Sequence, residues 1–241
     1  MRLVTANLIA TAMATALLLV GSSLRGQTAW YEGFEGPEPS WQDAGGNAQY
    51  RIEPPQRVRG EPHTGLGSER VVLRGSQGTY VYLRHEVGRP RVIDELLPTV
   101  WIKSDRSGLQ LSARIVMPRT EDPRTGRPIS TLVHGSSYTD VGRWQQLRIT
   151  DIPRLLARQI RVLHAELGPR IDSREAYLDH VLLNIYGGPG TTNVWIDDLD
   201  VAGSVPSTRT EEPGVAVGSG LPVGPVPPQA GRRRVELVGS V

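Results

Sequence analysis

Residues 192–203 include the side chains with the clearest potential for chemistry. The run alternates apolar and polar residues and stops at a glycine, which predicts a strand with one buried face. If Leu199 and Val201 point inward, the period of two places Trp195 and Asp197 on the same face. A buried carboxylate without a partner is too costly to retain, so Asp197 requires a strong partner. A cation near the end of the strand would supply it.

A second set of residues could bind a ligand on the outside of a sheet. Three stretches alternate so that aliphatic residues would be buried on one face: Val81 and Leu83, then Val100 and Ile102, then Leu109, Leu111, Ala113 and Ile115. The opposite face would be aromatic and polar, which suits stacking on a sugar ring and hydrogen bonding to its hydroxyls. The candidate ligand-binding residues are Tyr80, Tyr82, Arg84, Trp101, Lys103 and Arg114, with Gln110, Ser112, Asn184 and Tyr186 extending the face. The alternatives are that Trp101 belongs to the core, or that a helix or neighbouring domain covers this face.

Catalytic chemistry has little support. The five histidines are scattered and lack metal-ligand spacing. Ser136 and Ser137 lack the glycines of a nucleophile elbow. The absence of cysteine excludes disulfides, thiolate metal sites and a cysteine nucleophile. No catalytic residue is therefore assigned, although a lyase or hydrolase remains a third alternative because sequence cannot show carboxylate separations.

The charge distribution does not favour a polyanionic partner. The 27 basic and 25 acidic residues leave a net charge of +2, and Lys103 is the only lysine. Arginines are interspersed with carboxylates, except at Arg232, Arg233 and Arg234. Scattered charge of this size produces no strong field, so nucleic acid is not an expected partner.

Both ends of the chain differ from its middle. Arg2 precedes a short apolar run at residues 8–20 and then small residues, which is typical of a secretory signal peptide within residues 1–29. The run is shorter than the roughly 20 residues of a membrane-spanning helix, the alternative interpretation. Residues 204–230 are rich in proline and glycine without periodicity, which predicts a disordered linker. Residues 231–241 resemble the start of a truncated following segment, the alternative being a disordered tail. We expect an exported protein, either secreted or in the periplasm or cell envelope, with no membrane span after signal cleavage.

Residues 30–203 contain many short strand-like stretches separated by glycine, proline, asparagine and aspartate. This pattern predicts an all-β protein, an antiparallel sandwich or jelly roll. Residues 151–167 instead place apolar side chains at helical spacing, with Asp151 as the N-cap, Pro153 in the first turn and Gly168 at the end. One inserted α-helix is therefore expected against an edge or end of the sandwich. The expected strands are 30–35, 48–53, 69–74, 79–87, 99–104, 109–117, 129–134, 144–149, 177–186 and 194–201.

Three short motifs resemble those of jelly-roll carbohydrate-binding modules. These modules are galactose-binding-domain-like β-sandwiches attached to secreted polysaccharide-degrading enzymes. The motifs are residues 33–36 (GFEG) followed by Trp41, residues 142–147 (GRWQQL) and residues 195–199 (WIDDL). The resemblance spans about residues 30–203 and implies a jelly-roll sandwich. The helix departs from the family, most of whose members have a short loop there.

The resemblance also implies a structural calcium ion. In the family it is shared by a glutamate of the first strand and the first aspartate of the closing motif, here Glu35 and Asp197, with Asp198 a weaker candidate. Calcium binds several hard oxygen ligands, and such a tie would join the first and last strands. The alternative is that Asp197 and Asp198 solvate a strand end or accept turn N–H groups.

The function expected from the resemblance is that of a noncatalytic, glycan-binding accessory module of an exported protein. Its partners would be a polysaccharide or glycan and a downstream catalytic domain. The alternative is a structural or protein-interaction sandwich that packs on a missing downstream domain, for example one of the glycosidase kind. Fold likeness alone does not decide between these functions.

Overall fold

The computed structural model describes residues 28–168 and 170–203, and the expected linker, following segment and nearly all of the expected signal peptide lie outside them. Eleven strands and one helix occur in this part of the chain. In order they are β1 (Thr28–Glu32), β2 (Gln42–Gly46), β3 (Tyr50–Arg59), β4 (Gly67–Gly75), β5 (Val81–Glu86), β6 (Leu97–Ser104), β7 (Gln110–Glu121), β8 (Pro128–Ser137), β9 (Gln145–Arg148), α1 (Ile152–Leu167), β10 (Tyr177–Asn184) and β11 (Gly190–Ala202).

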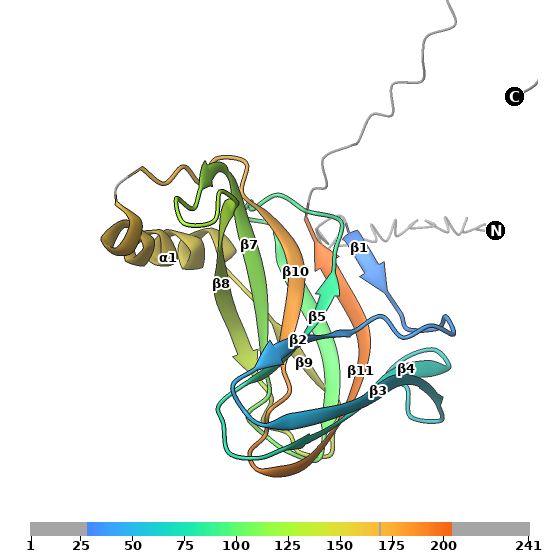
Figure 1. The fold of residues 1–241 in the computed structure, drawn as a ribbon. Coiled ribbons are helices and arrows are strands. Elements are labelled where there is room, and N and C mark those ends of the chain that lie inside the picture. Colours follow the sequence, from blue (N-terminus) through green and yellow to red (C-terminus); the bar gives the residue numbers. More distant parts are fainter. Residues whose placement is uncertain (1–27, 169, 204–241) are drawn as a thin grey trace, which may run out of the picture. The chain divides into compact units, whose positions relative to one another are not determined.

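The strands form two antiparallel sheets that lie one behind the other (Figure 1). Sheet A has the order β3-β4-β11-β6-β9, with β1 paired to β11, and sheet B has the order β2-β5-β10-β7-β8. From β4 to β7 the chain changes sheet at every connection, and the late strands β10 and β11 insert between earlier ones. This is the jelly-roll sandwich predicted from the sequence.

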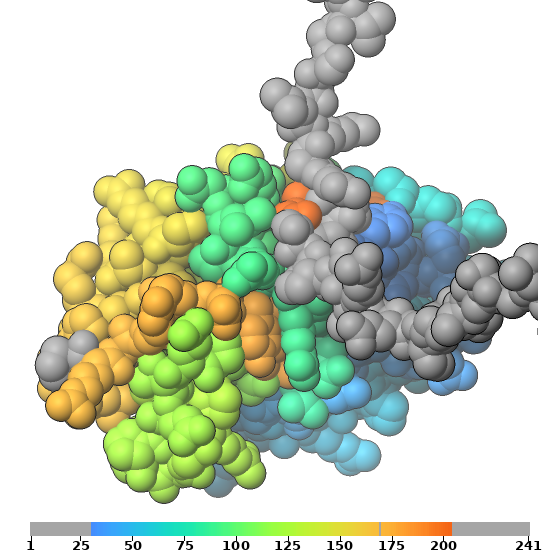
Figure 2. Space-filling view, turned by 90° about the horizontal axis from the view of Figure 1, so that it is seen from above, coloured from blue at the N-terminus to red at the C-terminus, as the bar shows by residue number. Residues whose placement is uncertain are grey.

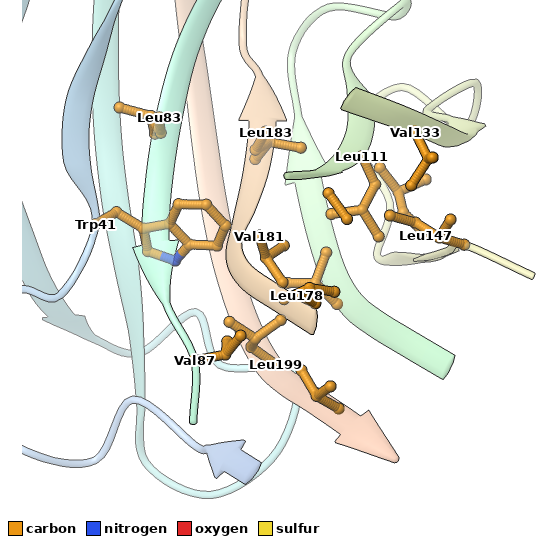
Figure 3. Packing of buried hydrophobic residues seen from close by; sticks show 14 of the residues in the cluster. Trp41, Leu83, Val87, Leu111, Val133, Leu147, Leu178, Val181, Leu183 and Leu199 are labelled. Carbon is orange, nitrogen blue, oxygen red and sulfur yellow. The ribbon is translucent and has the colours of Figure 1, made fainter. Parts of the chain in front are cut away.

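The core lies between the two sheets and follows the predicted alternation. The eight residues predicted to point inward on β5, on β6, and on or just before β7 are all buried with 0% exposure: Val81, Leu83, Val100, Ile102, Leu109, Leu111, Ala113 and Ile115. Figure 3 shows side chains from both sheets, among them Leu183 and Leu199, pointing into the space between them. Burial of this apolar surface drives the two layers together.

Strand β11 departs from the predicted alternation at one point. Val194 and Ile196 are buried before the register shift between Asp197 and Asp200, and Leu199 and Val201 are buried after it. Asp198 has φ +45°, the left-handed conformation of a bulge residue. Trp195 and Leu199 therefore face opposite sides, so the prediction that they share a face was wrong.

Helix α1 packs at the β8 edge of sheet B (Figure 1). Ile152 and Leu156 are buried, and Pro153 lies in the first turn as predicted. Asp151 is the N-cap residue, as predicted, but it has φ +56° and its side chain makes no capping hydrogen bond. The helical part of the described residues does not have the length and hydropathy of a membrane-spanning segment.

Strand β2 was not predicted. Its sequence, QDAGG, lacks the β-branched and aromatic residues that favour strands, and pairing with β5 holds it in place. Strand β3 also runs beyond its predicted end because a register shift between Glu53 and Gln56 accommodates Pro54 and Pro55. Neighbouring strands, not local propensity, define both elements.

The buried position of Leu83 predicts a large effect of truncation. We expect Leu83→Ala to lower the free energy of unfolding by about 2–5 kcal/mol, because it leaves a cavity between the sheets. Leu66→Ala is the matched control: Leu66 is 70% exposed, and its loss should change stability by less than about 0.5 kcal/mol. Urea unfolding measures both values, and equal effects would contradict the packing described.

The environment of His85 predicts a pH dependence of stability. His85 is buried among Trp30, Phe34 and Trp41, with ring centroids 4.7, 6.4 and 5.4 Å away. Burial lowers the pKa of His85 below its ordinary value of 6.5. The unfolded chain therefore takes up a proton there that the folded chain does not, and stability decreases as the pH falls below 6.5.

We expect urea midpoints to decrease between about pH 7.5 and about pH 5, and His85→Phe to reduce that decrease. His134→Gln is the control because His134 is exposed. An unchanged pH dependence in His85→Phe would show that another group is responsible.

Candidate ligand-binding face

The outer face of sheet B, hereafter the B face, brings together most of the predicted ligand-binding residues. Strand register aligns Tyr82 with Asn184 and Gln110 in one row across β5, β10 and β7. The next row contains Arg84, Leu182 and Ser112, flanked by Gln42 on β2 and His134 on β8. A third row contains Glu86, His180, Arg114 and Leu132.

Tyr80 and Tyr82 form the aromatic end of the B face. Their ring centroids are 5.2 Å apart and their planes are tilted by 36°. Tyr80 is 38% exposed, and Tyr82 is partly buried beside it. The pair therefore offers ring surface to a ligand while remaining anchored in the sheet.

Polar side chains surround these rings. Ser112 is fully buried, hydrogen-bonds to Tyr82 and shares a 2.9 Å hydrogen bond with Nδ1 of His134. Burial raises the pKa of Tyr82, and the bond with Ser112 opposes that effect. Asn184 accepts hydrogen bonds from the amides of Val81 and Tyr186, which fixes its side chain beside the tyrosines. The network orients Tyr82 and leaves the exposed His134 as an adjacent polar group.

The third row forms the charged end of the B face. Arg114 donates from Nε to both carboxylate oxygens of Asp179, at 3.0 and 3.1 Å, and its Nη2 lies 3.0 Å from Nδ1 of His180. The hydrogen bonds with Asp179 raise the pKa of Arg114. Burial raises the pKa of Asp179, but its hydrogen bonds with Arg114 and His180 outweigh burial and leave that pKa below the ordinary value. Arg114 is thus held by a protein carboxylate.

A groove of about 470 Å³ continues from this charged end. Arg114 and Asp179 form its inner wall, while the β7–β8 hairpin contributes Arg124 and Arg127 and α1 contributes Leu163 and Glu166. Figure 2 shows the hairpin (light green) beside residues 170–176 (orange) and helix α1 (yellow) at this end of the molecule. The helix therefore borders the groove and lies at the edge opposite Tyr80 and Tyr82.

Trp101 and Lys103 do not lie on the B face. They belong to β6 in sheet A, with their neighbours Val100 and Ile102 in the core, so their side chains occupy the opposite face of the sandwich. The predicted outward orientation was right, but the expectation of one shared face was wrong. Sequence alternation gives the direction of a side chain and does not say which sheet holds the strand.

On the outer face of sheet A, the aromatic rings contact other side chains of the protein. His63 stacks on Trp101 with ring centroids 3.8 Å apart, and Trp144 meets His63 edge-on at 5.8 Å. Lys103 lies 5.4 Å from the ring of Trp195 and pairs with Glu61. The loop of residues 60–66 between β3 and β4 therefore covers Trp101 and engages Lys103.

The bulge of β11 anchors that loop. Asp197, with 0% exposure, accepts hydrogen bonds from the amides of His63 (2.7 Å) and Thr64 (3.2 Å). Burial raises the pKa of Asp197. Asp198 accepts from Tyr31 at 2.6 Å and Thr64 at 2.8 Å, and lies 2.6 Å from Nδ1 of His63. The hydrogen bond between Tyr31 and Asp198 raises the pKa of the Tyr31 hydroxyl to about 12.

Glu35, the third predicted calcium ligand, contacts the same loop. Its Oε1 accepts from the amide of Leu66 at 2.9 Å. Gly65 has φ +64°, a conformation that L side chains rarely adopt, and a Cβ added there would displace the carboxylate of Glu35, so this position favours glycine. Glu35 and the two aspartates thus hold one loop from two sides.

The donor set as placed does not fit a calcium ion. The carboxylates of Asp197 and Asp198 face N–H groups, hydroxyls and His63, and the Glu35 oxygen faces an amide. In the described part of the chain, no three or more acidic, histidine or cysteine side chains are grouped to hold a metal ion. The hydrogen bonds supply the partner that the buried Asp197 requires, and calcium binding stays a prediction.

Sequence reasoning missed several residues of the B face. Gln42 lies on the unpredicted β2, and Asp179 and His180 adjoin a register shift that interrupts alternation on β10. Leu182 belongs to an apolar run, Val181 to Leu183, that hides which face it occupies. Tyr186, expected on this face, is 8% exposed, belongs to the core and donates its hydroxyl to Ser76, so that expectation was wrong.

Comparison with known proteins identifies no family model and no curated protein that matches the chain. Among solved structures, the family 22 carbohydrate-binding module and GH10 modules of a Clostridium thermocellum endo-1,4-β-D-xylanase, complexed with xylohexaose, match 73% of this chain at 14% identity and a TM-score of 0.42. The match spans only 28% of that xylanase chain.

Two isolated modules are matched over almost their whole length. A CBM22 xylan-binding domain from Paenibacillus barcinonensis is 13% identical with a TM-score of 0.41, covering 74% of this chain and 97% of that one. A family 11 carbohydrate-binding module of a Clostridium thermocellum cellulosomal cellulase is 13% identical with a TM-score of 0.42, covering 76% and 99%. All three structures are, or contain, modules of the class that the sequence motifs resemble. At these identities the likeness concerns the fold alone.

Proposed function

We propose that the chain is a noncatalytic glycan-binding module of an exported protein, and that the glycan lies on the B face. The observation that carries the proposal is the placement of the exposed Tyr80 and the partly buried Tyr82 beside a row of hydrogen-bonding side chains. A sugar ring has apolar C–H surfaces and a rim of hydroxyls. Aromatic rings and fixed polar groups complement these two features.

The B face is better suited to a ligand than the opposite face. On sheet A, Trp101 is stacked against His63, and the cationic groups of Arg70 and Lys103 lie 5.5 and 5.4 Å from the ring of Trp195. Both rings therefore already have partners within the protein. On the B face, by contrast, the rings of Tyr80 and Tyr82 contact one another with their planes tilted. Helix α1 lies at the opposite edge of sheet B.

The burial of Ser112 and the ion pairing of Asp179 support binding without catalysis. Ser112 has 0% exposure, so its hydrogen bond with His134 does not present a nucleophile to a ligand. Asp179 is paired with Arg114, and its lowered pKa keeps it ionised, which is unsuitable for a general acid. Export is supported by the charged and apolar pattern of residues 1–29.

A second candidate function is that of a structural sandwich whose sheet A packs on another domain. Trp101, Trp144 and Trp195 are partly exposed on or beside that sheet, and aromatic residues are enriched in the centres of protein interfaces. This function would depend on Trp101 and not on Tyr82.

Glycan binding predicts that Tyr82→Ala weakens binding to polysaccharide by at least about tenfold, because it removes a ring at the centre of the stacking surface. Affinity electrophoresis in gels containing xylan, mixed-linkage β-glucan or alginate measures the effect. Circular dichroism establishes that the variant remains folded.

Trp101→Ala is the matched control because it removes an aromatic ring from the opposite face. It should leave the affinity unchanged. Loss of binding in Trp101→Ala with normal binding in Tyr82→Ala would move the site to sheet A, and no retardation by any polysaccharide would contradict the proposal.

The calcium prediction, with Glu35 and Asp197 as the expected ligands and Asp198 as a weaker one, is tested separately, because hydrogen bonds engage these carboxylates in the structure. Binding to the folded state alone would add about 2.7 kcal/mol at a calcium concentration of about 100 times Kd. A chelator should then lower the melting temperature by several degrees, and Asp197→Ala should abolish that sensitivity. Identical melting curves with calcium and with EDTA would show that the hydrogen bonds to residues 63–66 suffice.

A further inference from the structure

Arg84 lies in the middle row of the B face. It lies on β5 between Tyr82 and Glu86, opposite Gln42 on β2 and Leu182 on β10. Its side chain is half-buried, and Nη2 donates to Oε1 of Gln42 at 3.1 Å. A ligand stacked on Tyr82 would therefore lie next to this guanidinium.

The charge of Arg84 lacks a protein counter-ion. No carboxylate in the described part of the chain forms an ion pair with it, and its buried Nε has no hydrogen-bond partner. Arg114 in the adjacent row provides the contrast, because Asp179 holds it through two bonds from Nε. The two arginines share a face and differ in whether the protein neutralises them.

The nearby carboxylates contact other groups. Glu86, two residues along the strand, is exposed to solvent, and its Oε1 lies 3.5 Å from Nε2 of His180 without a hydrogen bond. Asp43, next to Gln42 on β2, accepts from the hydroxyl of Tyr50 and the amide of Gly45, both at 2.8 Å. Asp179 pairs with Arg114. The positive charge on Arg84 is therefore available to a ligand.

We propose that Arg84 binds the carboxylate of an acidic sugar, so that the glycan recognised by the B face contains uronic acid residues. This inference rests on the proposed glycan-binding function and specifies its ligand class. A guanidinium binds a carboxylate through parallel N–H···O bonds, which are shorter and stronger than bonds between neutral groups. A half-buried cation with a neutral amide as its partner gains more from such an anion than from a hydroxyl, because burial weakens solvent screening.

The spacing of Tyr82 and Arg84 on β5 would allow one sugar to contact both side chains. Side chains two residues apart on a strand point to the same face, about 7 Å apart. A pyranose ring stacked on Tyr82 could thus direct an exocyclic carboxylate toward Arg84. Gln42 holds the guanidinium in place, which reduces the entropy lost on binding.

The experiment compares alginate with the same alginate after chemical reduction of its carboxyl groups to alcohols. Affinity electrophoresis at low and physiological salt is performed with the wild type, Arg84→Gln, Arg84→Lys and the control Arg74→Gln. Arg74 is an exposed arginine on β4 of the opposite sheet, paired with Glu53. Dextran and dextran sulfate separate carboxylate recognition from general attraction to anions.

We expect the wild type to bind alginate at least about tenfold more tightly than reduced alginate. Arg84→Gln should remove that preference without abolishing binding to the reduced polymer, Arg84→Lys should retain only part of it, and Arg74→Gln should behave as the wild type. Equal binding of alginate and reduced alginate by the wild type would overturn the acidic-sugar inference while leaving glycan binding intact. Stronger retardation by dextran sulfate than by alginate would also overturn it, in favour of nonspecific charge. Binding to none of these polymers, nor to xylan or mixed-linkage β-glucan, would instead reject the proposed function itself.

Discussion

The pairing of β11 with three other strands is the constraint on which the sandwich depends. This last strand lies between β4 and β6 and also pairs with β1, so the first and last strands of the described domain are adjacent. Its register buries Val194 and Ile196, and the bulge at Asp197 and Asp198 restores burial at Leu199 and Val201. The bulge also places the two carboxylates against His63 and Thr64. One local irregularity therefore both completes the core and anchors a loop.

That anchored loop makes the two outer faces chemically different. On sheet A it places His63 against Trp101 and Glu61 against Lys103, so aromatic and charged groups are paired within the protein. On sheet B, Tyr80 is 38% exposed and its ring contacts that of Tyr82, and helix α1 packs at the β8 edge. Both sheets have the same alternation of inward and outward residues, but their outer faces differ. The side chains of the sheet A face contact one another, whereas the B face offers aromatic rings, amides and a guanidinium to a ligand.

Alternation made much of this predictable from the sequence. Strands with clear alternation, such as the one containing Val81 and Leu83, were placed correctly, as was the helix, whose apolar residues follow the helical period. Strand β2 was missed because tertiary pairing, not local propensity, defines it. The bulge at Asp198 was missed because a left-handed conformation at an aspartate leaves no sequence pattern. The B face was only partly predicted: alternation showed that Tyr82 and Trp101 point outward, but only strand order separates them onto different sheets.

The central claim, that the B face is the recognition surface, is tested most directly by mapping a bound oligosaccharide with NMR. Backbone amide shifts of labelled protein would be followed during titration with soluble oligosaccharides from xylan, mixed-linkage β-glucan and alginate. The account predicts that a binding oligosaccharide perturbs amides of β5, β10 and β7 around Tyr82, Arg84 and Asn184 and leaves those around Trp101 and Trp195 unchanged. Perturbations concentrated on β6 and β11, with none around Tyr82, would contradict it.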